Sequence, residues 1–364
     1  MKLVFHDKRF RVLMIADTQE GICVNSDTIN LMNAILEKAK PDLAVFSGDQ
    51  IWGNTFKGNV DEVKRVLSEL LKPVTERKIP FTICFGNHDS EVGVSKEEQF
   101  KIYKTFEGFV GESVIGIDGV GNQCIEIYDN DIQKYLIYLF DSHENVKDGY
   151  DNVHKNQLEW YRKVRDEKAS AAGNLIPSIV IQHTPICEVF NILMEVKANT
   201  PGSVKGFGKY EGKNYILNKK LVKDTDFMLE LPCASYENSG EFEILKEKGD
   251  IKGVFFAHDH NNCYQSILDG ILIANTQGIG FNAYGPGLNR GARVIDLFAN
   301  GKLETFDLRY IDLLGHRVNN PLKYIIMKFV PINEYDAKKK TYALIRISII
   351  IIFIAILAFF ILYE

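Results

Sequence analysis

The chain has 364 residues, of which 46% are hydrophobic, 25% charged and 11% aromatic, and its mean hydropathy is −0.10. This composition excludes a disordered chain, a collagen-like fibre and a low-complexity linker, because it provides enough apolar side chains for a buried core. The 43 Lys and Arg against 48 Asp and Glu give a net charge of −5, so no nucleic-acid surface is evident. Six cysteines without a Cys-x-x-Cys pair indicate reduced thiols rather than a disulfide framework.

Short apolar runs alternate along the chain with amphipathic stretches. The apolar runs predict strands at 11–16, 43–47, 81–85, 135–140, 178–182, 253–257, 271–275 and 292–298. The stretches of helical period predict helices from Ser26 to just before Pro41, and at 60–71, 96–105, 155–168 and 240–248. This alternation indicates an α/β fold with an antiparallel or mixed part toward its end.

The C-terminal end of the chain is strongly apolar. Residues 343–363 contain one charge, Arg346, and at about 1.5 Å per residue they make roughly 31 Å of helix, enough to cross a bilayer core. Lysines at 338–340 precede this stretch, so the positive-inside rule places the larger part of the chain in the cytoplasm. A buried core helix is the alternative, but such helices rarely lack a polar face for five turns. We expect a connector at 321–342 and a C-terminal transmembrane helix as a single-pass anchor at 343–363.

Polar clusters follow five of the apolar runs, at the point where each run ends. In chain order they are Asp17-Thr18-Gln19, Asp49, Asn87-His88-Asp89, His183 and His258-Asp259-His260. The carboxyl ends of parallel strands share one edge of a sheet, so these side chains are expected to meet there. Carboxylate, amide oxygen and imidazole are the usual ligands of Mn, Fe and Zn, and so many donors suit two ions bridged by a carboxylate. The sequence therefore predicts a dinuclear metal site.

The order of these motifs resembles that of the calcineurin-like metallophosphoesterase superfamily. The segments GDQIWG, GNHDSE, ENSGEFEILKEKGDIKG and HDHNN resemble its purple-acid-phosphatase-related branch. The resemblance implies a catalytic domain at 1–320 with two mixed β-sheets in a four-layer sandwich flanked by helices.

The resemblance also assigns a role to each candidate residue. Asp17 and His260 would bind the first ion, Asp49 would bridge both ions, and Asn87, His183 and His258 would complete the second. His88 would face the phosphate as general acid or electrostatic partner, and Asp89 would orient its imidazole.

Three positions depart from the family pattern. Gln19 stands where the family usually has a metal-binding His, and it is equally compatible with a weak ligand and with an amide beside the ligands. Trp52 replaces a Tyr that binds ferric iron in many purple enzymes, so no charge-transfer colour is expected. Ala257 replaces a Gly before the His pair, a small change. Outside the motifs, Arg290 and Arg293 could reach a phosphate, although a solvated strand start is the more ordinary role of such residues.

These features predict hydrolysis of a phosphoester, a monoester in preference to a diester, by a metal-bound hydroxide. The alternative is a scaffold of the same fold that is catalytically weakened through Gln19, against which the retained His88 argues. The predicted anchor adds a lipid-linked phosphate as one candidate substrate.

Overall fold

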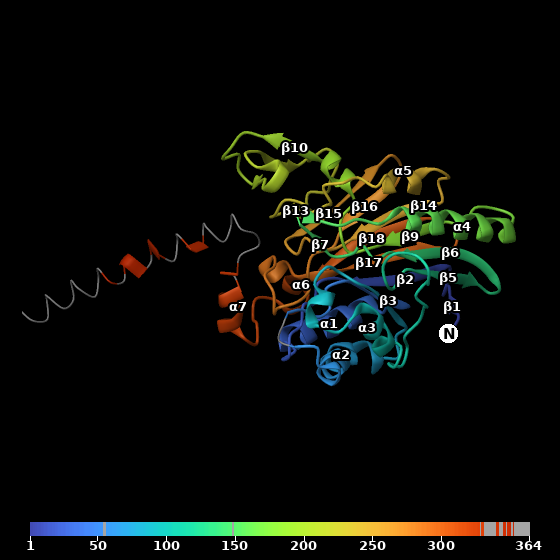
Figure 1. Cartoon of the computed structure of the whole chain (residues 1–364), viewed down its shortest axis with the longest axis horizontal. Helices are drawn as coiled ribbons and strands as arrows, with labels where there is room; N and C mark the ends of the chain where they lie inside the picture. The colour runs from blue at the N-terminus through green and yellow to red at the C-terminus, as the bar shows by residue number, and fades with distance from the viewer. Residues whose placement is uncertain are drawn as a thin grey trace, which may run out of the picture.

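The computed structural model describes residues 1–53, 56–147, 149–327, 329–330, 340–341, 345–346, 348–350 and 352. Two central β-sheets lie face to face, and helices cover their outer surfaces, as Figure 1 shows. The strand ends at one edge of this sandwich carry the polar clusters.

The smaller central sheet has five strands in the order β18-β17-β2-β3-β4. Their bounds are Leu303–Arg309, Gly291–Phe298, Arg9–Ile15, Leu43–Ser47 and Phe81–Cys84, respectively. Strands β2, β3 and β4 run parallel, whereas β17 pairs antiparallel with both β2 and β18. The three parallel strands therefore end at the same edge.

The larger central sheet has eight strands in the order β1-β5-β6-β9-β14-β16-β15-β13. Their bounds are Leu3–Val4, Gln123–Asp129, Ile132–Leu139, Ser178–Ile181, Ile251–Phe256, Ile271–Asn275, Asn262–Leu268 and Phe227–Met228. Strands β6, β9, β14 and β16 are parallel to one another. Two small sheets complete the described strands: β10 (Leu193–Val196), β12 (Asn214–Leu217) and β11 (Val204–Lys205), and the hairpin β7 (Asn145–Val146) and β8 (Gly149–Tyr150).

Local sequence signals explain where the three N-terminal helices begin. The side chains of Asn25, Asn59 and Ser95 each accept a backbone N–H from the first turn of α1 (Ser26–Ala39), α2 (Val60–Thr75) and α3 (Lys96–Tyr103). The remaining described α-helices are α4 (Lys155–Ala172), α5 (Glu241–Lys246), α6 (Tyr310–Leu314) and α7 (Pro321–Met327).

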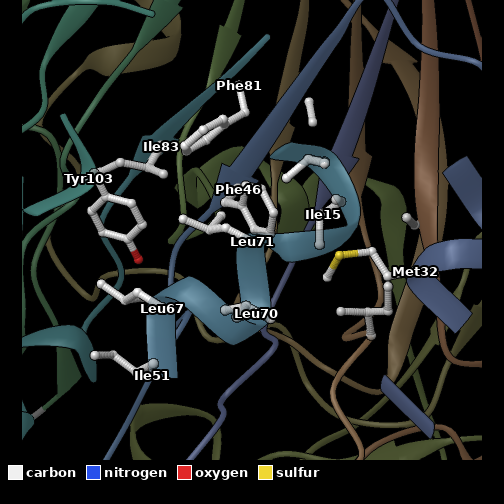
Figure 2. Packing of buried hydrophobic residues seen from close by; sticks show 14 of the residues in the cluster. Ile15, Met32, Phe46, Ile51, Leu67, Leu70, Leu71, Phe81, Ile83 and Tyr103 are labelled. Atoms are coloured by element: carbon white, nitrogen blue, oxygen red, sulfur yellow. The ribbon is translucent and has the colours of Figure 1, made fainter. Parts of the chain in front are cut away.

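Three layers of buried apolar side chains hold the sandwich together. Strand β2 illustrates how, because Leu13 and Ile15 pack toward the helices whereas Val12 and Met14 pack between the two sheets. Figure 2 shows the first layer, where leucines of α2 lie against Phe46 and Ile83 of the five-stranded sheet. A third cluster joins the outer face of the eight-stranded sheet to α4 and α5.

The mixed α/β architecture predicted from the sequence is confirmed, with sheets and helices in the expected order. The predicted transmembrane helix at 343–363 lies largely outside the described residues. Within the part of the chain that the structure describes, no helix has both the length and the apolar character needed to span a membrane.

Candidate metal centre

Six candidate ligands converge at the edge where the parallel strands of both sheets end. The loops after β2, β3 and β4 carry Asp17, Asp49 and Asn87, and the loops after β9 and β14 carry His183, His258 and His260. All six are buried, and the two loops of imidazoles face the three oxygen-bearing loops. Neither sheet alone holds the complete set.

The first group of donors consists of Asp17, Asp49 and His260. Each offers an atom within 4.8 Å of the others. Nε2 of His260 lies 3.3 Å from Oδ1 of Asp17, and the carbonyl of Tyr284 lies 3.1 Å from Nδ1 of the same imidazole. That second contact keeps Nδ1 protonated, so Nε2 is free to bind a cation.

The second group consists of Asp49, His183 and His258, with Asn87 beside them. Nε2 of His183 lies 3.3 Å from Oδ2 of Asp49, 3.2 Å from Nδ1 of His258 and 3.1 Å from Oδ1 of Asn87. Nδ1 of His183 contacts the carbonyl of Ser47 at 2.9 Å, so this ring also directs Nε2 toward the shared centre. Asp49 belongs to both groups, so its carboxylate would be shared if two ions were bound.

Charge and hydrogen bonding at these groups suit cations. Among the described residues, neither carboxylate oxygen of the buried Asp17 has a hydrogen-bond partner, an arrangement that is costly unless a cation or proton is bound. Burial lowers the pKa of His183, but the carboxylates of Asp49 and Asp17 outweigh burial and raise it to about 10. Burial and the neighbouring His183 hold the pKa of His258 well below its usual range. The donor set therefore fits two metal ions, whose identity is not fixed by these side chains.

The backbone of the site is held in an unusual conformation. Asp17, Gln19, Asp49 and His258 all have positive φ angles, of 51°, 39°, 54° and 69°. Residues other than Gly adopt this region infrequently and at a cost, and such residues cluster at functional sites. Here the left-handed conformation falls at four residues of the loops that bring the candidate ligands together.

Two glycines allow the loops to approach this closely. A Cβ atom on Gly48 would lie 2.3–2.6 Å from the ring of His183, and one on Gly86 would collide with the Asp49 carboxylate. Both positions therefore require Gly, because any side chain would displace a candidate ligand.

Gln19 lies inside the site, where its Nε2 donates to Oδ2 of Asp49 at 3.0 Å. The side chain is buried and lines the cavity beside the ligands. This position is compatible with both roles predicted for it, a weak ligand through Oε1 and an amide that holds the bridging carboxylate.

His88 lies at the rim of the site, and its partner differs from the one predicted. Oε1 of Glu91 lies 2.7 Å from Nδ1 of His88, whereas the Asp89 carboxylate is turned away to accept backbone N–H groups of Gly86 at 2.8 Å and Asp49 at 2.8 Å. The predicted orienting role of Asp89 was therefore wrong, because its carboxylate is used to fold the loops. Asp89 shapes the turn that carries Asp49, and Glu91 orients the imidazole.

The two arginines considered for phosphate binding are structural. Arg290 is buried and donates to the carbonyls of Gly280 and Ala283, and Arg293 is buried between β17 and the end of β16, where it donates to the carbonyl of Asn275 at 2.9 Å. Neither was predicted to be buried, because the sequence does not reveal which carbonyls a loop turns inward.

A cavity of about 400 Å³ opens from the metal centre. Besides the candidate ligands and His88, its walls include Trp52, Tyr150, Cys233, Tyr284 and Met327. Tyr150, Cys233 and Tyr284 were not predicted, because they reach the cavity from segments without a recognisable motif. Tyr284 stacks on the imidazole of His260 with ring centroids 4.3 Å apart.

Comparison with known proteins identifies the family. The chain belongs to the calcineurin-like phosphoesterases, whose sequence pattern matches residues 10–262. A relative from Arabidopsis thaliana named "Probable inactive purple acid phosphatase 14" is 26% identical over 332 residues, covering 80% of this chain and 75% of the relative. A second, "Phosphatase DCR2" from Saccharomyces cerevisiae, is 26% identical over 212 residues, 50% of this chain and 36% of that one.

A solved structure supports the same fold. The crystal structure of a dimetal phosphatase from Danio rerio superimposes with a TM-score of 0.51 at 12% identity, covering 83% of this chain and 99% of that one. The resemblance to the purple-acid-phosphatase-related branch is thereby confirmed by the relatives, and the fold by this neighbour.

Proposed function

We propose that the protein hydrolyses a phosphomonoester with two bound metal ions. The observation that carries this proposal is the convergence of six buried candidate ligands at one edge of the sandwich, with Asp49 belonging to both donor groups. Water attacks phosphorus, the bond from phosphorus to the alcohol oxygen breaks, and the products are inorganic phosphate and the alcohol. The preference for a monoester rests on the branch that the sequence resembles.

The side chains divide this chemistry between them. Two ions bound here would neutralise phosphate oxygens and lower the pKa of water, as dinuclear centres do. Asp49 holds the two donor groups in register, and the peptide N–H of His88 donates to its Oδ1 at 2.9 Å. His88, oriented by Glu91, delivers a proton to the departing alcohol oxygen.

The test uses the full chain with p-nitrophenyl phosphate and bis-p-nitrophenyl phosphate in the presence of Mn²⁺, Fe²⁺ or Zn²⁺. We expect turnover of the monoester to exceed that of the diester. Asn87→Ala should lower the metal content, whereas His88→Ala should keep it and lower kcat by about 10²–10⁴-fold. Absence of hydrolysis of both esters with every metal would contradict the proposal.

A second candidate function is a metal-binding scaffold of the same fold with little or no turnover. It is favoured by Gln19, a weaker ligand than imidazole, and by relatives whose names include the word inactive. Gln19→His separates the two. If the amide is a weak ligand, this variant gains metal affinity and turnover together, and unchanged metal affinity would contradict that role.

For localisation, we propose that residues 343–363 anchor the protein in a membrane with the phosphoesterase domain in the cytoplasm. The proposal rests on the apolar sequence and the preceding lysines. Extraction of cell membranes at alkaline pH should leave the full chain in the membrane and release a chain lacking 343–363. Equal release of both would refute it.

A further inference from the structure

The cavity beside the metal centre is lined largely by apolar and aromatic side chains apart from the candidate ligands. Beyond the candidate ligands it is lined by Trp52, Tyr284, Ala283, Met327 and Val330, together with Tyr150, Cys233 and Asn282. No Lys or Arg lines it within the described part of the chain. A sugar, nucleotide or acidic peptide would find few hydrogen-bonding or cationic partners on these walls.

Trp52 lines the cavity beside His88. Its ring lies edge-on to the imidazole of His88 with centroids 6.2 Å apart, and 38% of the residue is exposed. The backbone at this point is fixed, because the N–H of Trp52 donates to the carbonyl of Glu20 at 3.3 Å. The indole therefore lies beside His88 on the cavity lining.

Met327 and Val330 add to the cavity lining from the C-terminal part of the chain, which is tied to the core. The carboxylate of Asp27, at the start of α1, accepts the backbone N–H groups of Asn319 at 2.7 Å and Asn320 at 3.1 Å. Nζ of Lys323 donates to Oδ1 of Asn282 on the cavity rim. These bonds place α7 so that Met327 lines the cavity.

Helix α7, which carries Met327, also has exposed apolar side chains. Leu322, Ile325 and Ile326 of this helix are exposed. Single exposed apolar residues are ordinary, but these lie on the helix that lines the cavity through Met327.

We infer that this cavity binds the apolar leaving group of the substrate, so that the substrate class is an alkyl or aryl phosphomonoester. The inference rests on the proposed phosphomonoesterase function and adds the part that determines specificity. Trp52 and Met327 are the residues that contact the leaving group. The same chemistry is offered by a soluble alkyl phosphate and by a lipid phosphate.

Binding of n-alkylphosphonates measures this preference without turnover, because their P–C bond is not hydrolysed. The full chain loaded with Mn²⁺ is titrated calorimetrically with methyl-, butyl- and octylphosphonate. Each methylene buried in the cavity should lower Kd by about fourfold, which corresponds to about 0.8 kcal/mol. A hydroxyl-bearing phosphonate of similar size, such as 3-hydroxypropylphosphonate, should bind less tightly than butylphosphonate. A Kd that changes less than twofold from methyl to octyl would overturn the inference.

Variants of the lining residues test where in the protein the chain-length dependence of binding arises. Trp52→Ala and Met327→Ala should each weaken octylphosphonate binding by at least about fivefold while changing methylphosphonate binding much less. Ile115→Ala, at a residue that is 95% exposed and outside the cavity lining, is the control and should retain the full chain-length dependence. Retention of that dependence in both cavity variants would also overturn the inference.

Activity assays distinguish this inference from the proposed function on which it rests. If p-nitrophenyl phosphate is hydrolysed but the Kd of the phosphonates does not change with chain length, the proposed function is retained and the leaving-group cavity is overturned. If the Kd of the phosphonates falls strongly with chain length but no ester is hydrolysed, the cavity is supported and the proposed function is contradicted. Octyl phosphate in solution and phosphatidate in phosphatidylcholine vesicles are then compared with glycerol 2-phosphate. Faster turnover of either apolar ester supports the inference and identifies the source, and equal turnover of all three overturns it.

Discussion

Replacing Asp89 with alanine removes the carboxylate around which two metal-binding loops fold. Its oxygens accept N–H groups of Asp49 and Gly86 at 2.8 Å and of Gln50 at 3.0 Å, and the side chain is fully buried. Hydrogen bonds to a charged group contribute about 1.5–3 kcal/mol each, so three of them amount to roughly 5–9 kcal/mol before relaxation. Removing a buried carboxylate also recovers its desolvation cost, and we expect a net loss of about 3–5 kcal/mol in the free energy of unfolding.

Urea unfolding of Asp89→Ala, with and without a chelator, measures this loss. The loss should persist when metal is absent, because the hydrogen bonds belong to the protein, and the metal-loaded protein should in addition bind less metal. Asp131→Ala is the matched control, since this exposed carboxylate makes one solvent-screened ion pair with Lys2 and its loss should leave the unfolding curve nearly unchanged. An Asp89→Ala protein that unfolds within about 1 kcal/mol of the parent and retains its metal would refute the reasoning.

Three further variants test other parts of the structure. Gly86→Ala should reduce metal affinity at least about tenfold, because the new methyl group collides with Asp49, whereas Gly21→Ala, with open space around it, should not; equal affinities would refute the close approach. Glu91→Gln should lower kcat several-fold and leave metal content unchanged, and a loss of metal would instead make the carboxylate a structural support of the centre. Burial raises the pKa of Glu241 from its ordinary 4.5 to about 8, so its contribution to stability is fully present below pH 4.5 and is lost as pH rises through 8. The free energy of unfolding of Glu241→Gln and of the parent is measured with urea at pH 5 and pH 9. The variant should lack the part of the decrease between these pH values that is due to Glu241, which is at most about 5 kcal/mol. An unchanged pH dependence of the free energy of unfolding would contradict this expectation.

The core strands and the candidate ligands could be predicted because both depend on local sequence. Runs such as 43–47 and 271–275 are long enough and apolar enough to identify strands buried on both faces, and their bounds agree with β3 and β16. Since parallel strands share an edge, the polar residues after them could be expected to meet, and the structure brings them together. Their binding of metal stays a prediction.

The parts that could not be predicted depend on how loops turn. Asp89 follows His88 in the chain, and adjacency favoured it as the partner of the imidazole, but a short 3-10 turn at Asp89–Val92 brings Glu91 there instead. Short strands such as β11 and β13 have only two residues and carry no periodic pattern. The cavity walls come from Tyr284 and Met327, whose positions depend on long-range contacts.

The division of the ligands between two sheets has a consequence for assembly of the molecule. Asp17, Asp49 and Asn87 follow strands of the five-stranded sheet, whereas His183 and His258 follow strands of the eight-stranded sheet. A bound ion stabilises only the state in which the ligands from both sheets are close together. Metal binding would therefore stabilise the packing of the five-stranded sheet against the eight-stranded sheet. Such a centre can form only after the sheets have docked, a late step because the contacts join distant parts of the chain. During refolding, metal uptake would therefore report the docking of the sheets.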